Sequence, residues 1–143
     1  MQHSNKSEEQ IYELIKEDRD KYVGTFSAFV AGKKFLDKVK NVLFHTAEND
    51  HFIIGSDDEN TNAVAFCVQQ SLIKEGPHNV EWYEGELAWS VRIDGVSYFI
   101  QQGQANVTFL QRGDYRYGVS GDIDFVLPDG RRITGDFDIK LRE

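Results

Sequence analysis

The chain has 143 residues, of which 40% are hydrophobic and 13% aromatic, and its formal net charge is −8 at pH 7. This length is typical of a single domain that buries a substantial core. The negative charge argues against a nucleic acid or an anionic membrane as partner, because both would repel the chain.

The sequence has a single cysteine, Cys67, so no internal disulfide can form. It lies in the apolar run Ala63–Val68, which predicts a small buried side chain rather than a catalytic thiol. No segment approaches the roughly 20 apolar residues of a membrane span, and the polar N-terminus differs from a secretory signal. We therefore expect a cytoplasmic protein, an expectation that a leader absent from this sequence would change.

The N-terminal residues predict one short amphipathic helix. Ser7 and Gln10 have the spacing of a capping box, and apolar residues follow at helical spacing at positions 11, 14 and 15. The helix is expected to end between Glu17 and Asp20. Because a helix of this length is marginal in isolation, it should dock on the rest of the domain.

The first half of the remaining chain reads as strands at Tyr22–Ala31, His51–Ser56 and Ala63–Leu72. The segment Phe35–Phe44 fits either a helical turn or an irregular strand. The acidic stretch Asp57–Asn62 lacks the ligand spacing of an EF-hand, so we expect a solvated hairpin tip there.

A hairpin is predicted around Asp94-Gly95, because this dipeptide between two alternating apolar runs is typical of a two-residue type I′ turn. The turn keeps apolar residues opposite one another. The predicted pairs are Ile93 with Val96, Val91 with Tyr98 and Trp89 with Ile100.

Two three-residue loops predict the register of the last strands. The loop Pro128-Asp129-Gly130 keeps the apolar odd positions on one face, with Gly130 in the left-handed conformation. The loop Arg112-Gly113-Asp114 joins the two preceding strands. The predicted pairs are Phe125 with Ile133 and Gly121 with Phe137 across the first loop, and Phe109 with Tyr117 and Val107 with Val119 across the second.

Together these elements predict a mainly β domain with one short N-terminal helix. Residues 1–20 form the tail and helix, and residues 21–143 form an antiparallel β domain. From Trp89 to Leu141 we expect a meander of about six strands, with nothing helical between them, which excludes a parallel β-α-β sheet. An antiparallel barrel or a β-sandwich remains, and the sequential meander slightly favours an up-and-down barrel.

Several segments resemble an uncharacterised all-β domain family that is common in bacterial lipoproteins. The resemblance is carried by Thr25–Phe35, by Gly103–Val107, by Val119–Phe125 and by Gly135–Phe137. The sequence departs from the family because it has no lipid-accepting cysteine near the N-terminus and has a charged helix there instead. The resemblance implies a bacterial β-sandwich or barrel and no established activity.

Carboxylates gather on the predicted outer face of the last hairpin. The register places Asp122 directly opposite Asp136, with Asp124 and Asp138 one step along the same face. Like charges directly opposite one another are destabilising, and four carboxylates can hold a hard cation such as calcium. We expect a solvated face instead, because basic residues lie nearby at positions 131, 132, 140 and 142.

No catalytic motif or cofactor site is predicted elsewhere. The four histidines share no metal-ligand spacing, although His45 and His51 could meet across a tight turn. The sequence has no defensible Ser-His-Asp arrangement, phosphate-binding glycine loop or redox motif.

Aromatic side chains give the other candidate site. Core packing explains those on the apolar strand faces, but inward aromatics with polar tips can also line a ligand cavity. The candidate cavity residues are Trp89, Tyr98, Ile100, Phe109 and Tyr117. The pair Trp82-Tyr83, in a predicted loop, would be either an exposed interaction patch or a cover for the mouth of a barrel.

Three functions are consistent with this sequence. The first is a non-enzymatic binding domain for a small apolar or amphipathic ligand, and the second is an acidic interaction module that inhibits or neutralises a basic partner. The third is an enzyme, which a cleft holding a carboxylate or histidine of strongly perturbed pKa would mark. Exposed edge strands would also allow a homodimer.

Overall fold

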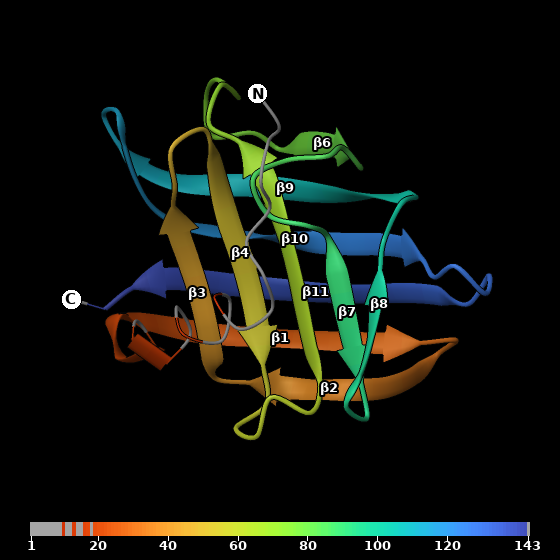
Figure 1. Ribbon diagram of the computed structural model, residues 1–143. Helices are drawn as coiled ribbons and strands as arrows, with labels where there is room; N and C mark the ends of the chain where they lie inside the picture. Colours follow the sequence, from red (N-terminus) through yellow and green to blue (C-terminus); the bar gives the residue numbers. More distant parts are fainter. Residues whose placement is uncertain (1–9, 11–12, 14–15, 18, 143) are drawn as a thin grey trace.

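The computed structural model describes residues 10, 13, 16–17 and 19–142, and their strands form two antiparallel sheets packed face to face (Figure 1). The larger sheet has the order β2 (Lys33–Val39), β1 (Tyr22–Val30), β11 (Arg132–Leu141), β10 (Tyr115–Val126), β9 (Gly103–Arg112) and β6 (His78–Glu81). The smaller sheet has the order β3 (Asn41–Thr46), β4 (Asp50–Ser56), β5 (Ala63–Gln69), β7 (Ser90–Ile93) and β8 (Val96–Phe99). Its strands cross steeply over those of the larger sheet (Figure 1). The prediction of a mainly β, antiparallel domain is confirmed, but the strands do not close into a barrel.

The two sheets meet at a cluster of buried aromatic rings. Phe66 of β5 has its ring centroid 5.5 Å from that of Trp89 and 5.7 Å from those of Phe125 and Phe137 in the larger sheet. Phe137 also stacks on Phe26 of β1 at 5.3 Å. Aromatic pairs of this kind add about 0.5–1.5 kcal/mol each beyond the area they bury, so these rings hold the two sheets together.

The predicted N-terminal helix, from Ser7 to between Glu17 and Asp20, falls largely outside the described residues and is not supported. In the part that the structure describes, the element before β1 is a three-residue 3-10 helix, η1 (Arg19–Lys21). The strands predicted at Tyr22–Ala31, His51–Ser56 and Ala63–Leu72 correspond to β1, β4 and β5.

Two of the three predicted hairpin registers are confirmed. Ile93 pairs with Val96, and both turn residues, Asp94 and Gly95, have positive φ angles of 50° and 80°, as a type I′ turn requires. Across the last loop the Leu127 N–H donates to the Arg131 carbonyl at 2.8 Å. The pairs there are those predicted, Phe125 with Ile133 and Gly121 with Phe137.

The predicted register between β9 and β10 is wrong. Arg112 pairs with Tyr115, so the turn has two residues rather than three, and a bulge at Tyr117 shifts the register before Gly118. The bulge restores the alternation of faces, which brings Val119 opposite Phe109 with both side chains buried. The predicted pairs of Phe109 with Tyr117 and of Val107 with Val119 therefore do not form.

The predicted single meander after Trp89 is also wrong, because the chain changes sheets within it. Strands β7 and β8 belong to the smaller sheet, and the chain then crosses through Ile100–Gln102 to β9 in the larger one. A similar crossing explains the ambiguous segment Phe35–Phe44. It contains the end of β2 and the start of β3, which lie in different sheets and are separated by Lys40 alone.

Candidate functional site

The structure separates the five predicted cavity residues into two groups. Trp89, Ile100 and Phe109 are core residues with at most 2% of their surface exposed. Tyr98 and Tyr117 are half-buried, and each lies under an arginine, with Arg131 5.4 Å from the Tyr98 ring centroid and Arg112 5.2 Å from that of Tyr117. None of the five lines either pocket described below.

The carboxylate face has the predicted register, with Asp122 opposite Asp136. The Asn106 side-chain amide donates to Asp122 at 3.0 Å. Arg132 holds both oxygens of Asp124, and this hydrogen bonding lowers the pKa of that carboxyl group. Among the residues that the structure describes, no three carboxylate, histidine or cysteine side chains are placed to share a metal ion. The geometry thus gives no support to a cation on Asp122, Asp124, Asp136 and Asp138.

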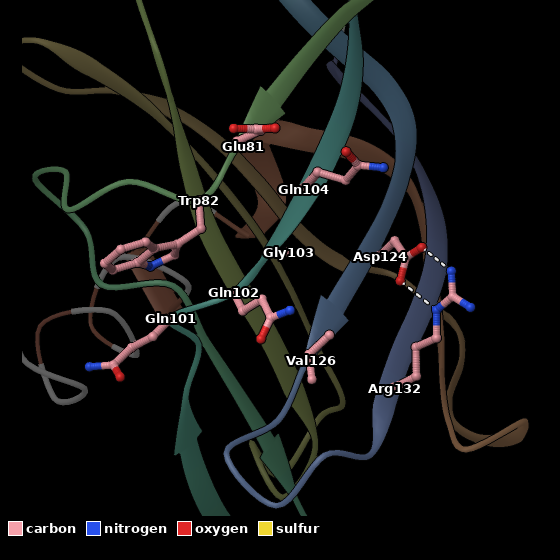
Figure 2. A pocket seen from close by; sticks show the side chains of 9 residues that line it. All are labelled: Glu81, Trp82, Gln101, Gln102, Gly103, Gln104, Asp124, Val126 and Arg132. Atoms are coloured by element: carbon pink, nitrogen blue, oxygen red, sulfur yellow. Dashed lines mark hydrogen bonds and ion pairs between the residues drawn. The ribbon is translucent and has the colours of Figure 1, made fainter.

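An open groove of about 490 Å³ lies on the outer face of the larger sheet, where β9 begins (Figure 2). Glu81, Gln104 and Asp124 form a row across β6, β9 and β10. Gly103 is required at this point, because a Cβ atom there would lie 2.7 Å from the Asp124 carbonyl oxygen. Figure 2 shows the indole of Trp82 lying apart from the paired Asp124 and Arg132. The groove is therefore lined by polar side chains, and the charge of its arginine, Arg132, is already neutralised by Asp124.

A second pocket, of about 730 Å³, lies at one end of the molecule, and we call it the end pocket. Three connections far apart in the sequence meet there: β3 to β4, β5 to β6, and β9 to β10 (Figure 1). The lining residues are Thr46, His51, Gln70–Lys74, Gln111 and Asp114–Arg116. Two apolar side chains of the lining are unusually exposed, Ile73 at 73% and Tyr115 at 57%. The end pocket thus combines apolar side chains with charged ones.

Arg116 is held rigidly in the lining of the end pocket. Its Nε donates to Gln111 Oε1 at 3.1 Å, and its Nη2 donates to the carbonyls of Leu72 and, at 3.2 Å, Lys74. Its guanidinium carbon lies 3.9 Å from the centroid of the Phe109 ring. The remaining nitrogen, Nη1, is buried and has no hydrogen-bond partner among the described residues. Burial lowers the pKa of Arg116 from its usual value.

His51 lies beside Arg116 and is neutral at pH 7. Only 5% of its surface is exposed, and its Nδ1 lies 3.0 Å from Thr46 Oγ1. Burial, reinforced by the charge of Arg116 and partly offset by Asp50, lowers the pKa of His51 to about 4. The predicted meeting with His45 does not occur. His45 pairs with Phe52 while His51 pairs with Thr46, which places the two imidazoles on opposite faces of the sheet.

The end pocket has the opposite charge to the whole molecule. Lys74 and Arg116 contribute two positive charges and Asp114 one negative charge, which gives the lining a net charge of +1. The whole chain has a formal net charge of −8. The lining of the end pocket therefore attracts negative charge, although the protein as a whole is acidic.

A buried polar cluster fastens the segment after β6 to the smaller sheet. Asp50, 5% exposed, accepts hydrogen bonds from the Tyr83 hydroxyl at 2.9 Å and from the Glu86 N–H at 2.8 Å. The Cys67 thiol donates to the Leu87 carbonyl at 3.3 Å, and burial raises its pKa to about 11. Cys67 is thus buried, as predicted, its thiol is protonated, and Tyr83 is tied into the fold.

The sequence analysis missed the end pocket. Arg116 stands between two tyrosines in an alternating strand, which identifies a polar position but no site. Comparisons with models of protein families, with curated proteins and with solved structures found no match for this chain. The resemblance to a lipoprotein domain family stays a prediction. In the part of the chain that the structure describes, no helix is both long and apolar enough to span a membrane.

Proposed function

We propose that this domain is a non-enzymatic binding module whose end pocket holds a small amphipathic ligand. The observation that carries the proposal is the pairing of exposed apolar side chains with the anchored cation Arg116 in one pocket. The volume of about 730 Å³ lies within the range of about 300–1,000 Å³ typical of small-molecule sites. The ligand site thus lies at the end of the molecule rather than among the core aromatics.

The state of His51 favours binding over catalysis. A histidine with a strongly perturbed pKa is the feature by which the sequence analysis would identify an enzyme, and His51 has such a pKa. Its neighbour Thr46 carries a hydroxyl group that a general base could activate. General bases work best when their pKa lies near the working pH. With a pKa of about 4, His51 attracts a proton too weakly at pH 7 to activate that hydroxyl. We therefore assign His51 to the wall of the pocket.

The proposal is tested by titrating isotope-labelled protein with sodium octanoate and with 1-octanol, followed by amide NMR. At least one of the two should shift the resonances of the lining residues Gln70–Lys74, Gln111 and Asp114–Arg116. A native mass spectrum of protein purified without refolding should show an added mass that denaturation removes. If neither compound shifts these resonances and no added mass is found, the proposed function is wrong.

A matched pair of variants locates the site. Ile73→Asp removes an exposed apolar side chain from the lining, and Val96→Asp makes the same kind of change at a 52% exposed residue on β8. Ile73→Asp should weaken binding of either compound about fivefold, because about 1 kcal/mol of apolar contact is lost. Val96→Asp should leave both affinities unchanged. Equal effects of the two variants would place the ligand elsewhere.

A further inference from the structure

We infer that the ligand of the end pocket is an amphipath with a single carboxylate, and that the carboxylate pairs with the guanidinium of Arg116. This inference rests on the proposed function and adds to it the chemistry of the head group. It depends on the hydrogen bonds of Arg116, on the charge of the lining and on the position of the exposed apolar side chains.

The hydrogen bonds of Arg116 leave one guanidinium nitrogen without an acceptor in the part of the chain that the structure describes. Nε and Nη2 donate to Gln111, Leu72 and Lys74, whereas Nη1 is buried without an acceptor among the described residues. Buried donors of charged groups nearly always have an acceptor, because leaving one unpaired is costly. A carboxylate oxygen is a strong acceptor for a guanidinium, and Arg116 belongs to the lining of a pocket of ligand size.

The charge of the lining favours one negative charge over two. Lys74 and Arg116 against Asp114 leave a net charge of +1, which a monoanion compensates. A phosphate monoester carries up to two negative charges at pH 7, so part of its charge would remain unpaired close to Asp114.

The guanidinium is fixed before any ligand arrives. It lies on the Phe109 ring at 3.9 Å and donates to three separate residues, so little side-chain entropy is lost on binding. The apolar part of the ligand would then lie against Ile73 and Tyr115, the two exposed apolar residues of the same lining. These positions require a ligand with a charged head and an apolar tail.

Calorimetric titration of the wild-type protein with three eight-carbon compounds tests the head group. Octanoate should bind about tenfold more tightly than 1-octanol, which has the same tail without the charge. Octyl phosphate should bind less tightly than octanoate. Equal affinities for octanoate and 1-octanol would refute the carboxylate while leaving the proposed function standing. Tighter binding of octyl phosphate would refute the single charge, and binding of none of the three would refute the proposed function itself.

Two variants with the same change in charge test the role of Arg116. Arg116→Gln should abolish the preference for octanoate and leave the affinity for 1-octanol within twofold of the wild type. The control, Arg132→Gln, removes a cation from the open groove and should keep the preference. An unchanged preference in folded Arg116→Gln would refute the assignment. If that variant fails to fold, Arg116→Lys takes its place, and a preference unchanged there would count against the guanidinium as the recognition group, because lysine keeps the charge and lacks the planar guanidinium.

Discussion

His51 is a buried histidine that folding keeps neutral. Its ring centroid lies 5.4 Å from that of Phe109, and it has the positive charge of Arg116 nearby. Both the apolar surroundings and the neighbouring cation disfavour the imidazolium form. The consequence is a folded state that resists protonation at this position while the unfolded chain accepts the proton readily.

This difference predicts a loss of stability in mild acid. The pKa of His51 is about 4 in the folded protein and about 6.5 in the unfolded chain, so its contribution is complete above pH 6.5 and is lost as the pH falls towards 4. We expect the free energy of unfolding to fall by about 2 kcal/mol from this residue between pH 7 and pH 4.5. Urea denaturation at both pH values measures it, with His51→Leu as the comparison. A fall of equal size in His51→Leu would refute the assignment to His51.

The pairing of β9 with β10 depends on a glycine that admits the neighbouring backbone. A Cβ atom at Gly121 would lie 1.8 Å from the carbonyl oxygen of Asn106 on β9. We expect Gly121→Ala to lower the free energy of unfolding by about 3 kcal/mol, because the strands must move apart. Gly113→Ala is the control. That glycine has no atom near its added Cβ and a φ of 60°, so a loss of about 1 kcal/mol is expected. Urea midpoints that differ little between the two variants would contradict this account.

Elements were predictable from the sequence where local chemistry decides them. The turns at Asp94-Gly95 and Pro128–Gly130 have a single arrangement that keeps apolar residues together, so their registers were predicted correctly. The register between β9 and β10 was not predictable, because the two-residue turn and the bulge at Tyr117 each move it by one position and together leave the pattern of faces unchanged. The sheet crossings at Lys40 and Ile100–Gln102 were missed for a similar reason, since alternation is the same whichever sheet a strand joins.

The end pocket was beyond sequence reasoning because it is a product of sheet packing. Its lining combines segments around residues 46–51, 70–74 and 111–116. No motif or spacing in the chain relates these segments. Only the face-to-face packing of the two sheets brings Arg116 of β10 to the carbonyls of Leu72 and Lys74, which follow β5.

At the scale of the molecule, the first strand pairs with the last. Strands β1 and β11 pair over nine residues, from Tyr22 with Leu141 to Val30 with Ile133, and β11 lies inside the larger sheet between β1 and β10. The larger sheet is therefore incomplete until β11 has been synthesised. Contacts so distant in sequence are slow to form during folding.

We expect a chain ending at residue 131, which lacks β11, to have no cooperative unfolding transition. The loss of β11 would separate the β1–β2 hairpin from β10. It would also expose the core residues that pack against Ile133, Phe137 and Ile139. Thermal unfolding followed by circular dichroism measures this. A peptide of residues 131–142 added in excess should restore the transition. A cooperative transition in the truncated chain alone would show that β11 is dispensable.

The end pocket takes its walls from both sheets, with His51 on β4 and Gln111 and Arg116 on β9 and β10. It therefore exists only while the sheets are packed, and a compound that occupies it binds the folded protein and not the unfolded chain. Such a compound raises the free energy of unfolding by about 2.7 kcal/mol at a hundred times its dissociation constant. The melting temperature of the unmodified protein is thus itself an assay, with which a collection of metabolites can be screened before any activity is known.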